Sequence, residues 1–212
     1  MLKSQLTVTN YYELILRQQP IAGVDEVGRG ALCGAVVAAA VILNPEFYGL
    51  LIEAGVRDSK KLSAKEREEL VPKIQAAAHS YYIGMATAAE IDRMGITKAN
   101  FLAMTRAIEG LAVTPEICLI DGKYPVRDIS IPQKCLIKGD DRSVSIAAAS
   151  ILAKVHRDQI MRELSIDHPE YDFASSKGYG TPKHRSALEK HGAISEHRRS
   201  FLGGITLPKK RN

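Results

Sequence analysis

Short runs of apolar residues define the first elements of the chain. Residues 21–27 and 35–43 are rich in valine, isoleucine and alanine, and the segment between them contains Gly28, Arg29 and Gly30. Two apolar runs joined by a glycine-containing loop are typical of a β-hairpin. We therefore predict two paired strands here and a third strand over residues 81–88.

Helical patterns follow the hairpin. Ser63 and Glu66 are spaced as a capping box, which predicts a helix that begins there and runs to about residue 78. Thr97 is the expected cap of a second helix, which carries an apolar stripe through about residue 111. Further helices are expected over residues 1–19, 143–164 and 183–190.

Two short apolar strands alternate with these helices. Residues 117–120 precede Asp121, and residues 135–137 end near Asp140. A strand meander followed by alternating helices and single strands predicts an α/β fold with a mixed sheet flanked by helices. We expect a main domain over residues 1–167 and a small, helical, basic C-terminal segment over residues 168–212.

Length and cysteine content narrow the class of protein. A chain of 212 residues fits one large domain or two small ones. Cys33, Cys118 and Cys135 are odd in number and have no paired spacing, which favours buried thiols in a reducing compartment over a disulfide framework. The N-terminus lacks a continuous apolar signal segment, and no apolar run is long enough to span a bilayer. We expect a soluble, cytoplasmic protein that makes no membrane contact.

Positive charge is concentrated near the C-terminus. The formal net charge is +5, but from Lys177 onward nine cations face two acids, which leaves a net −2 on residues 1–176. A basic end on a nearly neutral body indicates a polyanionic partner such as a nucleic acid. A solvated charged face is the alternative interpretation of the same feature.

Carboxylates next to apolar strands are the main chemical signal. Asp25 and Glu26 lie within the first strand, Asp121 follows the fourth, and Asp140 follows the fifth. Burying several carboxylates together is costly unless a cation relieves their repulsion. Hard oxygen ligands without nitrogen or sulfur neighbours favour Mg²⁺ or Mn²⁺ over zinc.

The strand pattern leaves questions open at these acids. Adjacent residues of a regular strand point to opposite faces, so Glu26 reaches the site of Asp25 either through a twist or bulge or from the sheet edge. Asp121 also fits an ordinary turn with Gly122. Asp140 and Asp141 also fit the positively charged start of the following helix.

Three loops carry candidate binding residues. A glycine–arginine–glycine loop, Gly28 to Gly30, permits close approach to a sugar–phosphate, although a tight turn explains it equally. Ser59 and Lys60 offer a hydroxyl and a cation for phosphate, or simply form a solvated loop. Tyr179 lies between two glycines of a basic loop, where it would stack on a base or sugar or pack within the loop.

Together these segments resemble the ribonuclease HII family. The similarity extends in order from about residue 21 to residue 201, through blocks at residues 22–30, 58–62, 121–122, 138–140, 145–158, 177–184 and 197–201. It implies a ribonuclease H-like catalytic domain over residues 1–167 and a C-terminal segment that completes the substrate-binding face. It also implies that Asp25, Glu26, Asp121 and Asp140 are both the catalytic residues and the ligands of two Mn²⁺ or Mg²⁺ ions. The neighbouring Asp141 leaves open which of the two acids faces the metal, and the family pattern favours Asp140.

The resemblance further implies how substrate is bound and cut. Gly28, Arg29 and Gly30 would recognise the 2′-hydroxyl of a ribonucleotide, and Tyr179 would stack on the sugar of the next nucleotide. Ser59, Lys60 and Arg198 complete the expected substrate-binding set. The implied reaction is hydrolysis 5′ of a ribonucleotide in an RNA–DNA hybrid or a ribonucleotide-containing DNA duplex. It leaves a 3′-hydroxyl and a 5′-phosphate, with roles in primer removal and ribonucleotide excision, and the expected enzyme is a monomer.

Two other functions remain as alternatives. One is a different nuclease of the ribonuclease H fold, such as a resolvase-type endonuclease, which would cut without regard to the 2′-hydroxyl. The other is a non-catalytic duplex-binding protein that uses only the basic tail, which would bind independently of metal and leave no cut product.

Overall fold

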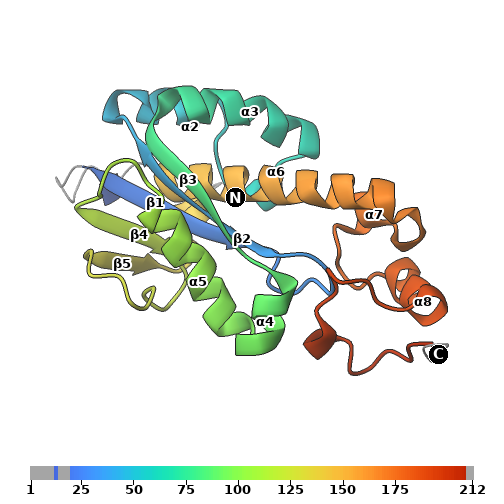
Figure 1. Cartoon of the computed structure of the whole chain (residues 1–212). Coiled ribbons are helices and arrows are strands. Elements are labelled where there is room, and N and C mark those ends of the chain that lie inside the picture. Colours follow the sequence, from blue (N-terminus) through green and yellow to red (C-terminus); the bar gives the residue numbers. More distant parts are fainter. Residues whose placement is uncertain (1–11, 14–19, 209–212) are drawn as a thin grey trace, which may run out of the picture.

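The computed structural model describes residues 12–13 and 20–208 of the chain. Within this part, five strands form one sheet in the order β3-β2-β1-β4-β5 (Figure 1). The strands are β1 (Ile21–Val27), β2 (Val36–Leu43), β3 (Ala78–Ala86), β4 (Ile117–Asp121) and β5 (Gln133–Leu136). β1, β2 and β3 pair antiparallel, whereas β4 pairs parallel to both β1 and β5. The sheet is therefore mixed, as the sequence predicted.

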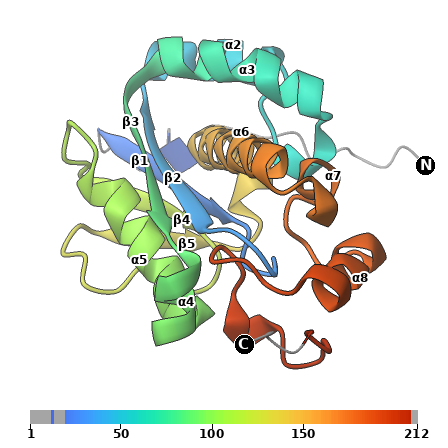
Figure 2. The same cartoon turned by 45° about the vertical axis from the view of Figure 1, so that its right-hand side comes forward.

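Helices cover both faces of the sheet (Figure 2). One layer contains α2 (Tyr48–Glu53), α3 (Ala64–Ala77) and α6 (Val144–Asp167), packed on the odd-numbered apolar side chains of β2. The other contains α4 (Ala88–Met94) and α5 (Ile96–Glu109), packed on the even-numbered ones. The alternation arises because successive side chains of a strand point to opposite faces of the sheet.

Small side chains bring α6 unusually close to the central strand. Every residue of α6 from Val144 to Ala153 is buried, and most are alanine or serine. A Cβ added at Gly23 of β1 would lie 2.1 Å from the backbone carbonyl carbon of Ser145. The close packing fixes the start of α6 against β1, which lies at the centre of the sheet.

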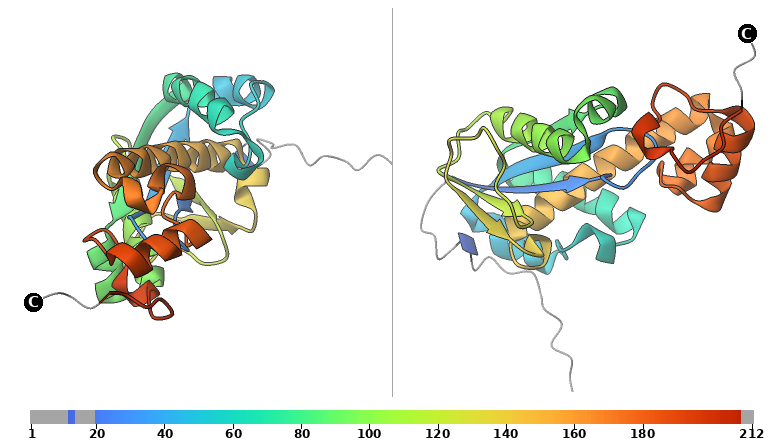
Figure 3. Two further views of the ribbon diagram at one scale, coloured as in Figure 1. Left: turned by 90° about the vertical axis from the view of Figure 1, so that its right-hand side faces the viewer. Right: turned by 90° about the horizontal axis from the view of Figure 1, so that it is seen from below.

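The chain after α6 forms a compact segment at one end of the sheet (Figure 3). It contains α7 (Phe173–Ser176), α8 (Pro182–His191) and short 3-10 turns at Pro169–Tyr171 and Arg199–Phe201. Its apolar cluster shares Leu32, Cys33 and Met161 with the preceding domain. The division at residue 167 stays a prediction, but the segment packs directly on the loop after β1.

Most of the predicted elements are confirmed, with shifted ends. Strands β1 and β2 form the predicted hairpin, and Ser63 forms both hydrogen bonds of its capping box. The predicted helix cap at Thr97 is wrong, because α5 begins at Ile96 after Gly95, whose φ of 80° ends the preceding helix. That preceding helix, α4, was missed, although Thr87 and Glu90 form a capping box in front of it. The predicted helix within residues 1–19 lies almost wholly outside the described residues.

The cysteines agree in part with the expectation of buried thiols. All three are free thiols, and Cys33 and Cys118 are buried, whereas Cys135 is only partly buried. Burial raises the pKa of the Cys118 thiol to about 12, which leaves it protonated. None of the helices in the described part of the chain is both long and apolar enough to cross a bilayer.

Within the C-terminal segment, two buried histidines connect the turn at Ile194 to the loop of Tyr179. The backbone N–H of Ile194 donates to His197 Nδ1 at 3.1 Å, so the hydrogen of His197 is on Nε2. That nitrogen lies 3.0 Å from His184 Nε2, and His184 Nδ1 in turn donates to the carbonyl of Tyr179 at 2.9 Å. This directional chain requires both rings to be neutral, because a second proton would place two donors face to face.

Acid should therefore destabilise the C-terminal segment. Burial, reinforced by repulsion from His184, lowers the pKa of His197 from 6.5 to about 4. The neutral His197 ring therefore contributes fully to stability above pH 6.5. As the pH falls toward 4 the unfolded chain takes up a proton at this residue before the folded protein does, and the free energy of unfolding decreases by up to about 3 kcal/mol. Urea unfolding measured across this range should show a weaker pH dependence in His197→Gln than in the wild type. His191→Gln, which changes an exposed histidine of α8, should behave like the wild type. An unchanged slope in His197→Gln would contradict this account.

Candidate active site

The four predicted acids converge at one edge of the sheet. The β1–β4 ladder ends with Val24 paired to Ile120, so Asp25 and Asp121 are the next residues of two neighbouring parallel strands. Asp140 lies in a 3-10 turn, Gly139–Asp141, directly after β5. Because parallel strands end at the same edge, the topology brings these carboxyl groups together, as the sequence predicted.

Glu26 joins the group from the other face of the sheet. Asp25 shares its face with Gly23, which packs on α6, and Glu26 therefore points to the opposite face. The β1–β2 register is continuous through Val27, so no bulge redirects the side chain. Glu26 instead lies at the end of the strand, where its carboxylate accepts a hydrogen bond from Arg29 at 3.3 Å. Of the alternatives left by the sequence, the register excludes a bulge, and approach from the sheet edge stays a prediction.

Burial raises the pKa of all four acids, and repulsion within the group adds to the effect at Asp25, Glu26 and Asp140. For Asp25, which is 4% exposed, desolvation is the largest cause, followed by the charges of Glu26 and Asp121. Desolvation also raises the pKa of Glu26 and of Asp121. It raises the pKa of Asp140 to about 6, with the charge of Asp121 adding to the effect. A cluster of this kind favours the binding of protons or of metal cations, because either would relieve the unfavourable burial of negative charge.

Fixed donors hold the carboxylates in position. The backbone N–H of Gly139 donates to Asp121 Oδ1 at 2.7 Å, which ties β4 to the turn that carries Asp140. A hydrogen bond from Ser150 of α6 lowers the pKa of Asp25 and so opposes the effect of burial. Ser150 was not identified from the sequence, since a serine in an alanine-rich helix gives no signal of its own.

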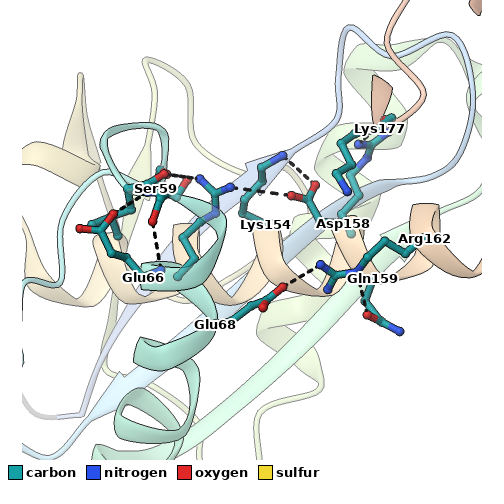
Figure 4. Close-up of polar contacts among 12 residues, drawn as sticks. Ser59, Glu66, Glu68, Lys154, Asp158, Gln159, Arg162 and Lys177 are labelled. Carbon is teal, nitrogen blue, oxygen red and sulfur yellow. Dashed lines mark hydrogen bonds and ion pairs between the residues drawn. The ribbon is translucent and has the colours of Figure 1, made fainter. Parts of the chain in front are cut away.

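Ser59 is buried behind the acids and supports them through hydrogen bonds. Its hydroxyl lies 2.9 Å from that of Ser150, so the two hydroxyls connect the Ser59 turn to Asp25. Arg67 of α3 donates to the carbonyl of Ser59 at 2.7 Å and lies 3.9 Å from Asp158 of α6. Figure 4 shows this network, with Ser59 and Asp158 joined through the guanidinium between them.

Lys60 places a positive charge beside the acids. Its Nζ lies 3.9 Å from Asp140 Oδ2 while the side chain stays largely exposed. Burial alone would lower the pKa of Lys60, but the carboxylates of Asp140, Asp58 and Asp25 raise it. The cation therefore faces both the acids and solvent.

A second acidic group shares Asp140. Carboxylate oxygens of Asp58, Asp140 and Asp141 all lie within 4.8 Å of one another. Asp141 is paired with Lys61, and Asp58 accepts a hydrogen bond from the backbone N–H of Lys60 at 2.9 Å. Asp141 therefore has a cationic partner of its own, whereas Asp25 and Asp121 have no ion pair within the described residues.

Gly28 and Gly30 of the adjacent loop differ in backbone conformation and in surroundings. Gly28 has a φ of 91°, and a Cβ there would lie 2.2 Å from Nε of Arg157, so the protein itself requires glycine. Gly30 is exposed, and a Cβ there would meet nothing within 4 Å. Neither backbone strain nor packing within the protein therefore requires glycine at position 30.

Tyr179 and Arg198 have contrasting surroundings. Tyr179 is 36% exposed, and the guanidinium of Arg157 lies 5.4 Å from its ring centroid. Arg198 is 0% exposed and donates to the carbonyls of Gly34, Arg29 and Gly28. Tyr179 is open to a ligand, and Arg198 touches the loop that would bind one.

Comparison with known proteins gives a consistent result. The family model described as Ribonuclease HII matches residues 22–203. The ribonuclease HII of Trichormus variabilis is 53% identical over 181 residues, which cover 85% of this chain and 80% of that protein. That of Staphylococcus saprophyticus is 47% identical over 208 residues, covering 94% of this chain and 79% of the relative. The crystal structure of ribonuclease H2 from Pyrococcus horikoshii superposes with a TM-score of 0.74 at 27% identity, covering 85% of this chain and 92% of that one.

Neutralising one of the clustered acids should stabilise the metal-free protein. Asp25→Asn replaces a desolvated charge that Glu26 and Asp121 repel, and we expect the free energy of unfolding to rise by about 1–2 kcal/mol. Urea unfolding in the presence of a chelator at neutral pH measures the change. Asp141→Asn serves as the control, because it removes an acid that is paired with Lys61 and should not stabilise. A loss of stability in Asp25→Asn would show that the carboxylates do not strain the site.

Proposed function

Because the chain belongs to the ribonuclease HII family, and is thus a metal-dependent endoribonuclease H, we propose that it hydrolyses the phosphodiester bond 5′ of a ribonucleotide. The substrates are RNA–DNA hybrids or DNA duplexes with embedded ribonucleotides, and the products carry a 3′-hydroxyl and a 5′-phosphate. One observation carries the proposal: four clustered carboxylates lie at the sheet edge beside an exposed glycine loop.

The acids at the edge fit divalent cations. Asp25, Glu26, Asp121 and Asp140 offer only oxygen ligands, and their raised pKa values reflect crowding that cations would relieve. Hard oxygen donors suit Mg²⁺ and Mn²⁺. When bound as a pair, such ions lower the pKa of the attacking water and stabilise the charge on the departing 3′-oxygen.

The protein supplies orientation and charge around the reacting phosphate. Gly139 and Ser150 keep Asp121 and Asp25 in fixed positions, so the carboxylates need little rearrangement when substrate binds. Lys60, exposed next to Asp140, would attract a substrate phosphate. No protein nucleophile is required, because water is the attacking group.

Recognition of the ribonucleotide falls to the glycine loop. Only the 2′-hydroxyl distinguishes a ribonucleotide from a deoxynucleotide at a given site. Gly28 gives the loop its shape, Arg29 projects a cation, and Gly30 leaves room for a sugar to approach the backbone. These features support recognition of the 2′-hydroxyl by Gly28, Arg29 and Gly30.

Tyr179 would stack on the sugar of the following nucleotide. Its ring is partly exposed and backed by the guanidinium of Arg157, and its carbonyl is held by His184. Stacking on a supported aromatic ring is a common way to bind nucleic acid. Residues 168–212 thus complete the substrate-binding face, with the basic side chains that follow Lys177.

Ser59 and Arg198 would act on substrate indirectly. Both side chains are buried, Ser59 against Ser150 and Arg198 against the carbonyls of the glycine loop. We assign them to positioning the groups that touch substrate. In the cell, a monomeric cytoplasmic enzyme of this kind would remove RNA primers and excise single ribonucleotides from DNA.

The two alternative functions have less support. A resolvase-type nuclease does not recognise the 2′-hydroxyl, so it would not require the open surroundings that Gly30 offers to an approaching ribose. A non-catalytic duplex-binding protein gains nothing from four repelling carboxylates, which cost stability without a cation.

Cleavage of defined duplexes tests the proposed reaction. An end-labelled DNA duplex with one ribonucleotide, incubated with Mg²⁺ or Mn²⁺, should be cut once, 5′ of that residue. An all-DNA duplex and the Asp25→Asn variant should give no product. Cutting that ignores the ribonucleotide would favour a resolvase-type enzyme, and metal-independent binding without cutting would favour a duplex-binding protein.

A single methyl group should separate recognition from stability at the loop. Gly30→Ala meets no steric obstacle, so the free energy of unfolding should change by less than about 1 kcal/mol. The methyl group would obstruct the approaching sugar, and kcat/KM for the single-ribonucleotide duplex should fall at least about tenfold. Thermal unfolding and steady-state cleavage measure the two effects. Full activity in Gly30→Ala would show that the sugar does not approach this position.

A further inference from the structure

Two arginine side chains are buried beneath the glycine loop. Arg157 of α6 is 1% exposed and Arg198 of the C-terminal segment is 0% exposed. Neither forms an ion pair with a carboxylate anywhere in the described part of the chain. Burial and the charge of Arg157 lower the pKa of Arg198 to about 10, still well above neutrality. Two cations are thus held inside the protein without a counterion, an arrangement that costs stability.

Backbone carbonyls take the place of the missing carboxylates. Arg198 donates to the carbonyls of Gly28 and Arg29 at 2.8 Å and of Gly34 at 2.9 Å. Arg157 donates to the carbonyls of Cys33 and Ala35 at 3.2 Å and of Lys177 at 2.9 Å. Each guanidinium therefore binds three carbonyls through three separate nitrogens of its planar fork, whereas a lysine has its three donors on a single nitrogen.

Turning these carbonyls inward fixes the direction of the neighbouring N–H groups. In a trans peptide, the C=O of one residue and the N–H of the next point in opposite directions. The carbonyls of Gly28 and Arg29 point at Arg198, so the N–H groups of Arg29 and Gly30 point away from it. Among the described residues neither N–H has a hydrogen-bond partner, and both residues are exposed.

Arg157 also couples this loop to the loop of Tyr179. Its guanidinium contacts carbonyls on both sides, that of Cys33, which follows the glycine loop, and that of Lys177 beside Tyr179. The same group lies against the Tyr179 ring at 5.4 Å. Arg157 therefore helps to set the relative position of the two segments assigned to the ribose and the following sugar, together with the backbone N–H groups of Leu32 and Cys33, which donate to the carbonyl of Gly178.

We propose that Arg157 and Arg198 are positioning residues for ribonucleotide recognition. Arg198 holds the carbonyls of Gly28 and Arg29 inward so that the N–H groups of Arg29 and Gly30 face the 2′-hydroxyl, and Arg157 fixes the segment behind them through the carbonyls of Cys33 and Ala35. The inference rests on the proposed function, because it assigns the source of that enzyme's discrimination between ribose and deoxyribose. Neither arginine touches substrate. Their contribution is to the orientation of peptide groups that the sequence of the loop, being rich in glycine, does not fix by itself.

Binding of two duplexes separates this role from general support of the fold. Fluorescently labelled duplexes, identical except for one ribonucleotide, are titrated with enzyme in Ca²⁺ to slow cleavage, and the ratio of their Kd values is recorded. We expect Arg157→Met and Arg198→Met to reduce the preference for the ribonucleotide duplex at least fivefold. The Kd for the all-DNA duplex should stay within twofold, because phosphate contacts are unchanged. Arg162→Met, which changes a partly exposed arginine of α6 that pairs with Glu68, is the matched control and should keep the wild-type ratio.

The outcomes distinguish the inference from the proposed function. If the wild type prefers the ribonucleotide duplex and folded arginine variants keep that preference, the inference is overturned and the proposed function stands. If the wild type shows no preference, the recognition role of the loop fails and the inference fails with it. Should a methionine variant not fold, Arg198→Lys and Arg157→Lys decide. They keep the charge but not the fork, so loss of preference supports the inference and retention overturns it.

Discussion

Repulsion among carboxylates at one edge of the sheet is the constraint on which the rest of the structure depends. β1 and β4 run parallel and end together, so Asp25 and Asp121 are neighbours by topology. Glu26 and Asp140 complete the group from the opposite face and from the turn after β5. Burial and repulsion raise the pKa of acids such as Asp25 and Asp140, so holding them together as carboxylates costs free energy. Favourable packing elsewhere in the molecule must offset that cost.

The packing of α6 supplies much of that support. Its small residues allow the start of the helix to lie directly on β1, where Gly23 leaves no space for a side chain. The same helix carries Ser150, which bonds Asp25, and two turns further on it carries Arg157, which bonds the carbonyls of Cys33 and Ala35 just after the glycine loop. One helix thus connects the acids, the loop and the C-terminal segment. At the acids and near the glycine loop alike, buried side chains fix the orientation of the groups that would face the substrate.

The sequence predicted the elements whose signals are local. The hairpin of β1 and β2, the capping box at Ser63 and the four acids at strand ends were all identified from residue type and spacing. What could not be predicted depends on contacts between distant segments. Arg157 and Arg198 are ordinary cations in the sequence, and only the fold reveals that both are buried against carbonyls of residues 28–35. Ser150 and the route by which Glu26 reaches the edge are of the same kind, because each is decided by a partner far along the chain.

The central claim is that divalent cations bind at the acids of the sheet edge, and counting bound Mn²⁺ tests it most directly. Electron paramagnetic resonance of free Mn²⁺ measures the binding stoichiometry of the metal-free protein and its variants. The account predicts that Asp121→Asn loses binding, while Asp141→Asn, whose acid already has Lys61 as a partner, keeps it. The reverse pattern, with binding lost in Asp141→Asn and kept in Asp121→Asn, would place the metal among Asp58, Asp140 and Asp141 and contradict the account.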